Sequence, residues 1–166
     1  VNVNLVTDAQ YYNWDRAGFG FYNILRQVQK MEEEAVNFNN ENYLAIAKFF
    51  KAYIFEQLTR QFGDIPFSEA LQAEQGNITP RYDDQKSVYQ EILNLLEDAN
   101  NQLDLTGAGI TGDVVYQGDL LKWKKLINSY HLRVLMNLSR KVGDPDLDLI
   151  ERFNTIYSNS AQYPLM

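Results

Sequence analysis

The 166-residue sequence contains no cysteine, which excludes disulfides, thiolate metal sites and thiol nucleophiles. It contains one histidine, and no run of about 18 apolar residues that could span a membrane. Positive charge is also scarce, with 15 Lys and Arg against 22 Asp and Glu and a net charge of -7. Because binding to phosphate needs clustered cations, this balance argues against nucleic acid as a partner.

Aromatic residues are abundant, with eleven Tyr, nine Phe and two Trp. Many of these rings must lie in a core, but Tyr also suits surfaces that contact a ligand. The proportions of hydrophobic and charged residues, 45% and 22%, are ordinary for a globular protein. The sequence has neither an initiating Met nor a signal peptide. We therefore expect residues 1–166 to be a single helical domain and a piece of a longer protein.

Apolar spacing predicts five helices. The predicted ranges are 13–36, 41–62, 84–103, a fourth that follows Asp119 and ends near Arg140, and a fifth from Asp144-Pro145 to Tyr157. The third is the clearest, with one apolar stripe and Asp84 as its N-cap. Gly63 is expected to end the second. Strand signals are almost absent, and Val114–Tyr116 is at most a short strand.

The fourth helix, within 118–140, carries apolar residues on more than one face and so needs neighbours on two sides. We expect an all-α fold in which antiparallel helix pairs stack in a tetratricopeptide-like array with long irregular connections. The connection 64–83 should be pinned to the core by Ile65, Phe67, Ala70, Leu71 and Ile78. Asn128 and Ser129 should tie the fourth helix to a neighbour, and Arg133 can pair with a carboxylate.

Three patterns that could indicate chemistry are weak. Residues 107–112 match G-x-G-x-x-G, but a helix precedes them and no helix follows directly, so we read a flexible loop and not a nucleotide site. His131 is more consistent with a core histidine than with a catalytic one. The acidic runs Glu32–Glu34 and Asp83-Asp84 are typical of solvated faces, and no pair of acids is placed across a cleft. No metal site or cofactor is predicted.

The aromatic group at Tyr11, Tyr12 and Trp14 is the candidate ligand site. Flat rings beside the Asn13 amide resemble a sugar-binding surface, because rings cover the apolar faces of a sugar and amides bind its hydroxyls. The alternative is that Trp14 begins the core stripe of the first helix. We favour that alternative for Trp14 and leave Tyr11 and Tyr12 open.

Several segments together resemble the SusD/RagB family of cell-surface nutrient-binding lipoproteins. The segments that carry the resemblance are 47–53, 62–71, 79–83, 88–92, 116–119, 122–125 and 128–133. No one of them decides the match, but their order and spacing across most of the chain make it specific.

The resemblance implies a non-catalytic protein that binds a glycan or another nutrient and delivers it to a SusC-like TonB-dependent outer-membrane transporter. It implies a surface-exposed lipoprotein of the cell outer membrane, attached only through a lipid anchor whose cysteine is not in this chain. The chain would be the helical, N-terminal-side portion of such a protein. The alternative is a tetratricopeptide-like scaffold that binds a protein partner and no small molecule. An enzyme is disfavoured, because no acid pair is placed.

Overall fold

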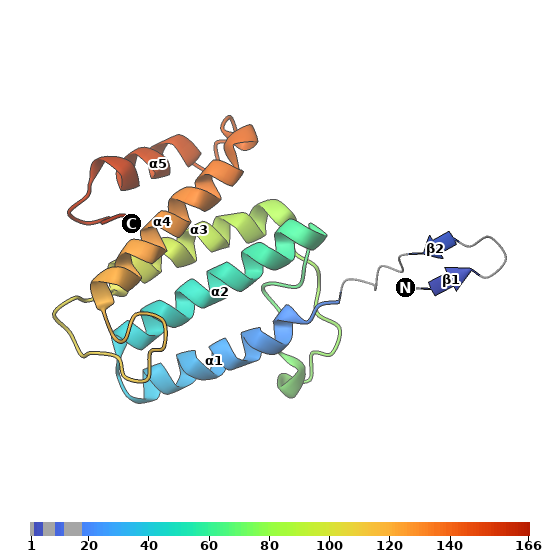
Figure 1. Ribbon diagram of the computed structural model, residues 1–166, viewed down its shortest axis with the longest axis horizontal. Helices are drawn as coiled ribbons and strands as arrows, with labels where there is room; N and C mark the ends of the chain where they lie inside the picture. Colours follow the sequence, from blue (N-terminus) through green and yellow to red (C-terminus); the bar gives the residue numbers. More distant parts are fainter. Residues whose placement is uncertain (1, 5–8, 12–17) are drawn as a thin grey trace.

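The computed structural model describes residues 2–4, 9–11 and 18–166 (Figure 1). The described part contains five α-helices: α1 (Phe21–Asn37), α2 (Glu41–Phe62), α3 (Gln85–Gln102), α4 (Leu120–Asn137) and α5 (Leu149–Ser158). Two single-turn 3-10 helices, η1 (Ala73–Gln75) and η2 (Ser139–Lys141), lie in the connections. The predicted all-α class is confirmed.

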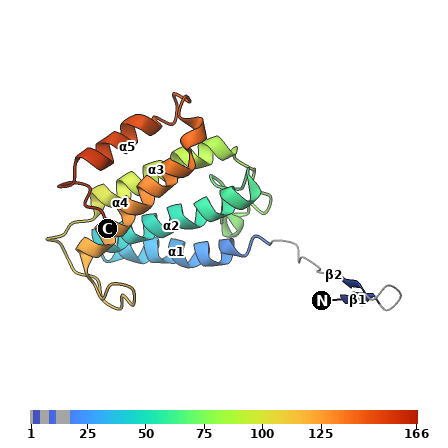
Figure 2. The same ribbon diagram turned by 45° about the horizontal axis from the view of Figure 1, so that its top comes forward.

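Each helix packs against the next one in the sequence, and successive helices run in opposite directions (Figure 1). Figure 2 shows α1 and α5 on opposite sides of the stack, with the other three helices between them. The antiparallel, tetratricopeptide-like stacking is therefore confirmed. The packing of α2 on α3 is the most extensive in the stack, so the two predicted pairs are joined into one continuous layer.

The central helix α2 is buried on several faces because small and large side chains alternate around it. Ala45, Ala47 and Ala52 are fully buried, and their size lets neighbouring backbones approach closely. Asn40 caps its N-terminus by accepting hydrogen bonds from two backbone N–H groups. Gly63, at φ +77°, ends it with a positive φ that glycine adopts without strain.

Helix α4 also has neighbours on more than one side, as expected. Trp123 meets Phe50 of α2 and Tyr116 of the preceding loop edge-on, with ring centroids 5.7 and 5.3 Å apart. Asn128 Nδ2 donates to Pro164 O, and Met166 N donates to Ser129 Oγ, so these polar residues hold the C-terminal segment against α4. No helix among the described residues is long and apolar enough to cross a membrane.

The prediction that Arg133 pairs with a carboxylate is wrong. Its guanidinium carbon lies 4.2 Å from the centroid of the Tyr130 ring. The described residues contain no ion pair of Arg133. The negative face of the aromatic ring therefore takes the place of an anion.

Three local predictions also need correction. Helix α1 begins at Phe21 and not at residue 13, since the glycines at 18 and 20 precede it. Helix α5 begins at Leu149, because Asp144 accepts a hydrogen bond from Asp146 N and so forms a turn instead of a cap. Ile78 is 80% exposed and does not pin the connection.

The sequence predicts almost no strand, with at most a short one at 114–116. Val114–Tyr116 is a turn, held by Asp113 Oδ1, which accepts from Val115 N at 2.8 Å. Within the described residues two short strands are present, β1 (Asn2–Asn4) and β2 (Ala9–Tyr11), which pair antiparallel with Val3 opposite Gln10. Two strands of three residues each leave the fold helical.

Candidate functional site

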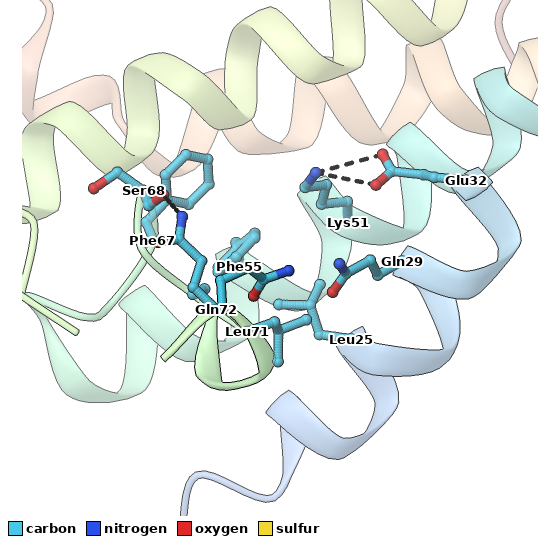
Figure 3. Close-up of a pocket in the computed structure, with 11 residues that line it drawn as sticks. Leu25, Gln29, Glu32, Lys51, Phe55, Phe67, Ser68, Leu71 and Gln72 are labelled. Carbon is cyan, nitrogen blue, oxygen red and sulfur yellow. Dashed lines mark hydrogen bonds and ion pairs between the residues drawn. The ribbon is translucent and has the colours of Figure 1, made fainter. Parts of the chain in front are cut away.

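A cleft of about 450 Å³ lies between α1, α2 and the irregular connection 63–84 (Figure 3). Its apolar lining consists of Leu25, Phe55, Phe67, Ala70 and Leu71, and its polar lining of Gln29, Glu32, Lys51, Ser68, Gln72 and Gln75. This volume falls within the usual range for small-molecule sites, and the mixture of an apolar floor with a few polar groups is typical of them.

The α1 wall of the cleft comes from one helical face. Leu25, Gln29 and Glu32 are four and three residues apart, so they lie above one another on α1. Lys51 of α2 faces them, and its Nζ lies 3.1 Å from Glu32 Oε2 (Figure 3). The expectation that Glu32 belongs to a solvated acidic face is therefore corrected: its charge is balanced inside the cleft. Glu33 and Glu34 are exposed and pair with Lys30.

Asp83 holds the wall of the cleft that the connection 63–84 forms. Its Oδ2 accepts hydrogen bonds from Phe67 N at 3.0 Å and from Ser68 N at 2.7 Å, and the Ser68 hydroxyl donates at 2.9 Å. Burial alone would raise the pKa of the Asp83 carboxyl, but these donors and the nearby Arg81 cation hold it below its usual value. The carboxylate therefore stays charged and keeps the two cleft residues in place.

Further contacts shape the same wall. Glu69 accepts from Arg81 N and Asn77 Nδ2, both at 3.0 Å, and the Tyr22 hydroxyl donates to Pro66 O. Leu71 has φ +62°, a left-handed conformation that costs a non-glycine residue about 1 kcal/mol or more. Its side chain packs against the core and lines the cleft, so this strain is maintained where the cleft is formed.

Removing the Asp83 carboxylate should open this wall locally. In Asp83→Ala, Phe67 N and the Ser68 donors lose their acceptor. Since hydrogen bonds to a charged group are worth about 1.5–3 kcal/mol, we expect tryptic cleavage after Arg81 to become roughly tenfold faster or more. Limited proteolysis followed by mass spectrometry measures this rate. The matched control is Asp98→Ala, which removes a 60% exposed carboxylate from α3. Equal cleavage rates in both variants would contradict the role given to Asp83.

The uncharged polar groups of the cleft suit the binding of a ligand. Gln29, Gln72 and Gln75 supply uncharged donors and acceptors, which suit hydroxyl and amide groups of a neutral ligand.

Ser68 has no histidine beside it, because His131, the only one in the sequence, is fully buried in the stack. Burial, together with the charge of Arg152, lowers the pKa of His131 to about 3, so it is neutral. Among the described residues, no group of three or more acids and histidines could hold a metal ion.

The glycine-rich segment 107–112 has no dinucleotide geometry, as predicted. Helix α3 precedes it, and turns separate it from α4. Our description of it as a flexible loop needs correction, because α2 holds it with hydrogen bonds. Asn42 Nδ2 donates to Asp104 O and Ala108 O at 3.0 and 2.8 Å, and Thr111 N donates to the Tyr43 hydroxyl at 2.6 Å.

Of the three predicted ligand residues, the structure describes the backbone of Tyr11. Tyr11 ends β2, where its backbone pairs with Asn2. Tyr12 and Trp14 lie outside the described residues. Their role in ligand binding stays a prediction.

A SusD-like family model, described as "Starch-binding associating with outer membrane", matches residues 2–166. The chain belongs to the SusD-like family. No functionally curated protein matches it. The expected helical fold of a SusD-like protein agrees with the five stacked helices found here.

Solved SusD-like structures are similar over nearly the whole chain. A SusD homologue from Bacteroides fragilis NCTC 9343 is 45% identical with a TM-score of 0.81, and the match covers 94% of this chain and 33% of that one. A SusD homologue from Bacteroides uniformis ATCC 8492 is 29% identical with a TM-score of 0.64, over 81% of this chain and 27% of that one. A chitin-binding protein is also 29% identical, with a TM-score of 0.66, over 84% of this chain and 28% of that one. The chain thus spans about a third of the first of these relatives, whose covered share is 33%.

Sequence reasoning missed the cleft. The spacing of Leu25, Gln29 and Glu32 marks one face of α1, and that signal was readable. The positions of Gln72 and Gln75 were not, because they lie in a connection without periodicity. The connection is held instead by hydrogen bonds to Asp83 and Glu69 from Phe67, Ser68, Asn77 and Arg81, which span 8 to 16 residues along the chain.

Proposed function

We propose that this SusD-like chain is part of a cell-surface protein that binds an oligosaccharide without transforming it and delivers it to a TonB-dependent outer-membrane transporter. The observation that carries the proposal is the family match over residues 2–166, whose description is starch binding associated with the outer membrane. The likeness to a chitin-binding protein supports a carbohydrate as the nutrient.

The proposed mechanism combines aromatic stacking with hydrogen bonding. Tyr11, Tyr12 and Trp14 would cover apolar faces of sugar rings, since flat rings match the C–H faces of a pyranose. The cleft in Figure 3 supports a binding role, because its amides and its neutralised Lys51–Glu32 pair suit uncharged hydroxyl groups. No pair of acids faces across it, so hydrolysis of the sugar is not part of the proposal.

The same proposal includes the location and the partner. Residues 1–166 would act as one helical domain within a longer surface lipoprotein whose lipid anchor lies outside this chain. The SusC-like transporter would be the partner, contacted through the stacked helices. Support for both comes from the SusD-like family membership and from the length of the solved relatives.

Affinity measurements test the binding step. The 166-residue chain is titrated by calorimetry with maltoheptaose and with chitohexaose. We expect Trp14→Ala to weaken binding about tenfold, which corresponds to the loss of one stacked ring. The affinity of Gln72→Ala, measured in the same way, tests whether the cleft binds the sugar. Tyr157→Ala is the matched control, since this ring is 67% exposed on α5 and lies outside the cleft lining.

The outcomes separate the proposal from the scaffold alternative. Unchanged affinity in both Trp14→Ala and Gln72→Ala would remove both candidate sites. If neither oligosaccharide binds while the full-length protein still co-purifies with its transporter, the chain is an interaction scaffold, and carbohydrate binding by this portion is rejected.

A further inference from the structure

Phe38 is the most exposed aromatic side chain among the residues that the structure describes. It lies at the turn between α1 and α2 and is 79% exposed. An apolar ring in this position contributes little to the stability of the fold. The residues around it are amides: Asn37 precedes it, and Asn39 and Asn40 follow it. The side chains of Asn37 and Asn39 are exposed and make no hydrogen bond within the residues described.

The turn that carries Phe38 is held firmly at its base. Phe38 N donates to Glu34 O, and Asn40 N donates to Ala35 O, both at 2.9 Å. Asn40 Oδ1 accepts from Asn42 N at 3.1 Å and from Tyr43 N at 3.3 Å. This leaves the Nδ2 hydrogens of Asn40 free of any partner among the described residues. The backbone thus presents an aromatic ring and a free amide at fixed positions.

A cavity of about 370 Å³ lies beside the ring. Its lining consists of Met31, Glu34, Ala35, Phe38, Asn40 and Tyr43. The Tyr43 hydroxyl is already used, because it donates to Thr111 O at 2.8 Å and accepts from Thr111 N. Its ring is therefore fixed as part of the wall. The groups that can meet a ligand are one exposed ring, one free amide and the Glu34 carboxylate, of which Oε1 already pairs with Lys30 Nζ at 3.2 Å.

This cavity is separate from the cleft of Figure 3. The cleft uses Leu25, Gln29 and Glu32 of α1, whereas the cavity uses Met31 and Ala35. At 3.6 residues per turn, Leu25 and Met31 point in directions roughly 120° apart around the helix. The two sites share no lining residue.

We propose that the α1–α2 turn is a second carbohydrate contact site, with Phe38 as the stacking platform and Asn40 and Glu34 as hydrogen-bond partners for hydroxyl groups. The apolar face of a sugar ring covers the Phe38 ring, and the surrounding amides remain hydrogen-bonded through the sugar hydroxyls and water. A protein partner with an apolar patch fits less well, because it would bury the amides without partners. This inference rests on the proposed carbohydrate-binding function and adds a site to it.

The test maps contacts residue by residue. The 15N-labelled chain is titrated with maltoheptaose and, separately, with chitohexaose, and backbone amide shifts are followed by NMR. We expect shifts over residues 34–43. In Phe38→Ala the affinity reported by these amides should fall about tenfold, while shifts elsewhere keep their original affinity. Phe38→Trp should retain binding at the turn, and Tyr157→Ala should leave it unchanged.

Each result decides a different point. If shifts are found only outside 34–43, the turn is not a sugar site, and the proposed function stands without it. If neither sugar causes a shift anywhere, both proposals are overturned. If the shifts at the turn persist in Phe38→Ala with unchanged affinity, the ring is not the platform and the inference fails. The thermal unfolding midpoint of Phe38→Ala should match that of the wild type, since the exposed ring supports no packing.

Discussion

Phe55→Ala should lower the free energy of unfolding by about 3–5 kcal/mol, the usual cost of truncating a buried phenylalanine. Phe55 is 1% exposed and lies beneath the cleft, with its ring centroid 4.4 Å from that of Phe67 and 6.3 Å from that of Tyr22. Its removal leaves a cavity where α1, α2 and the connection meet. A chain of this size has about 5–15 kcal/mol of stability, so the variant should be close to unfolding at moderate temperature.

Denaturant unfolding followed by circular dichroism measures this change. Phe38→Ala is a matched control, because it makes the same substitution at a ring that is 79% exposed. The control should change the unfolding free energy by less than about 0.5 kcal/mol. Similar losses in the two variants would show that burial beneath the cleft is not what makes Phe55 important. Phe55→Leu should be intermediate, since it retains most of the buried volume.

Asp113→Ala should cost about 3 kcal/mol, the second large effect expected here. The Asp113 carboxylate accepts from Trp123 Nε1 at 2.7 Å, Val115 N at 2.8 Å and Gly118 N at 3.0 Å. It therefore joins the loop before α4 to the ring that packs α4 on α2. Asp113→Asn keeps an acceptor of the same shape and should lose less than half as much. Asp98→Asn, at an exposed position on α3, is the control.

The same carboxylate makes stability depend on acid. Burial alone would raise the pKa of Asp113, but the hydrogen bonds from Gly118, Trp123, Val115 and Tyr116 lower it from 3.8 to about 2. Its contribution is present above the unfolded-state pKa and is lost as pH falls from about 4 to about 2. Unfolding midpoints measured across this window should fall less steeply in Asp113→Asn than in the wild type. Parallel curves for the two proteins would contradict this assignment.

Local signals explain which parts of the helices could be predicted. Asp84 caps α3 as expected, and Asp119, after which the fourth helix was expected to begin, caps α4. Each carboxylate accepts from the N–H group three residues on, at Ser87 and Lys122. These interactions lie within one helical turn, so the sequence shows them directly. The predicted start of α5, at Asp144-Pro145, was wrong for a related reason. Asp144 has two local options, a cap or a turn, and the packing of Leu147 and Leu149 into the core accompanies the turn.

The candidate sites were less predictable than the helices. Aromatic residues beside amides occur at both 11–14 and 37–40, and the sequence does not show which of the rings are exposed. In the sequence, the asparagines at 37, 39 and 40 indicate only where the first helix ends, because their side chains compete with helical hydrogen bonds. The exposure of Phe38 and the cavity next to it follow from how α1 and α2 pack.

By itself, the sequence determined the helical class, the order of the five helices, the absence of thiol chemistry and the SusD-like resemblance. These follow from composition and from periodicities within one or two helical turns, which do not depend on distant residues. Only the tertiary structure decided that Lys51 neutralises Glu32, that Arg133 lies over Tyr130 and that a polar connection completes a cleft. Those arrangements depend on hydrogen bonds and packing between residues far apart in the chain, which no local pattern records.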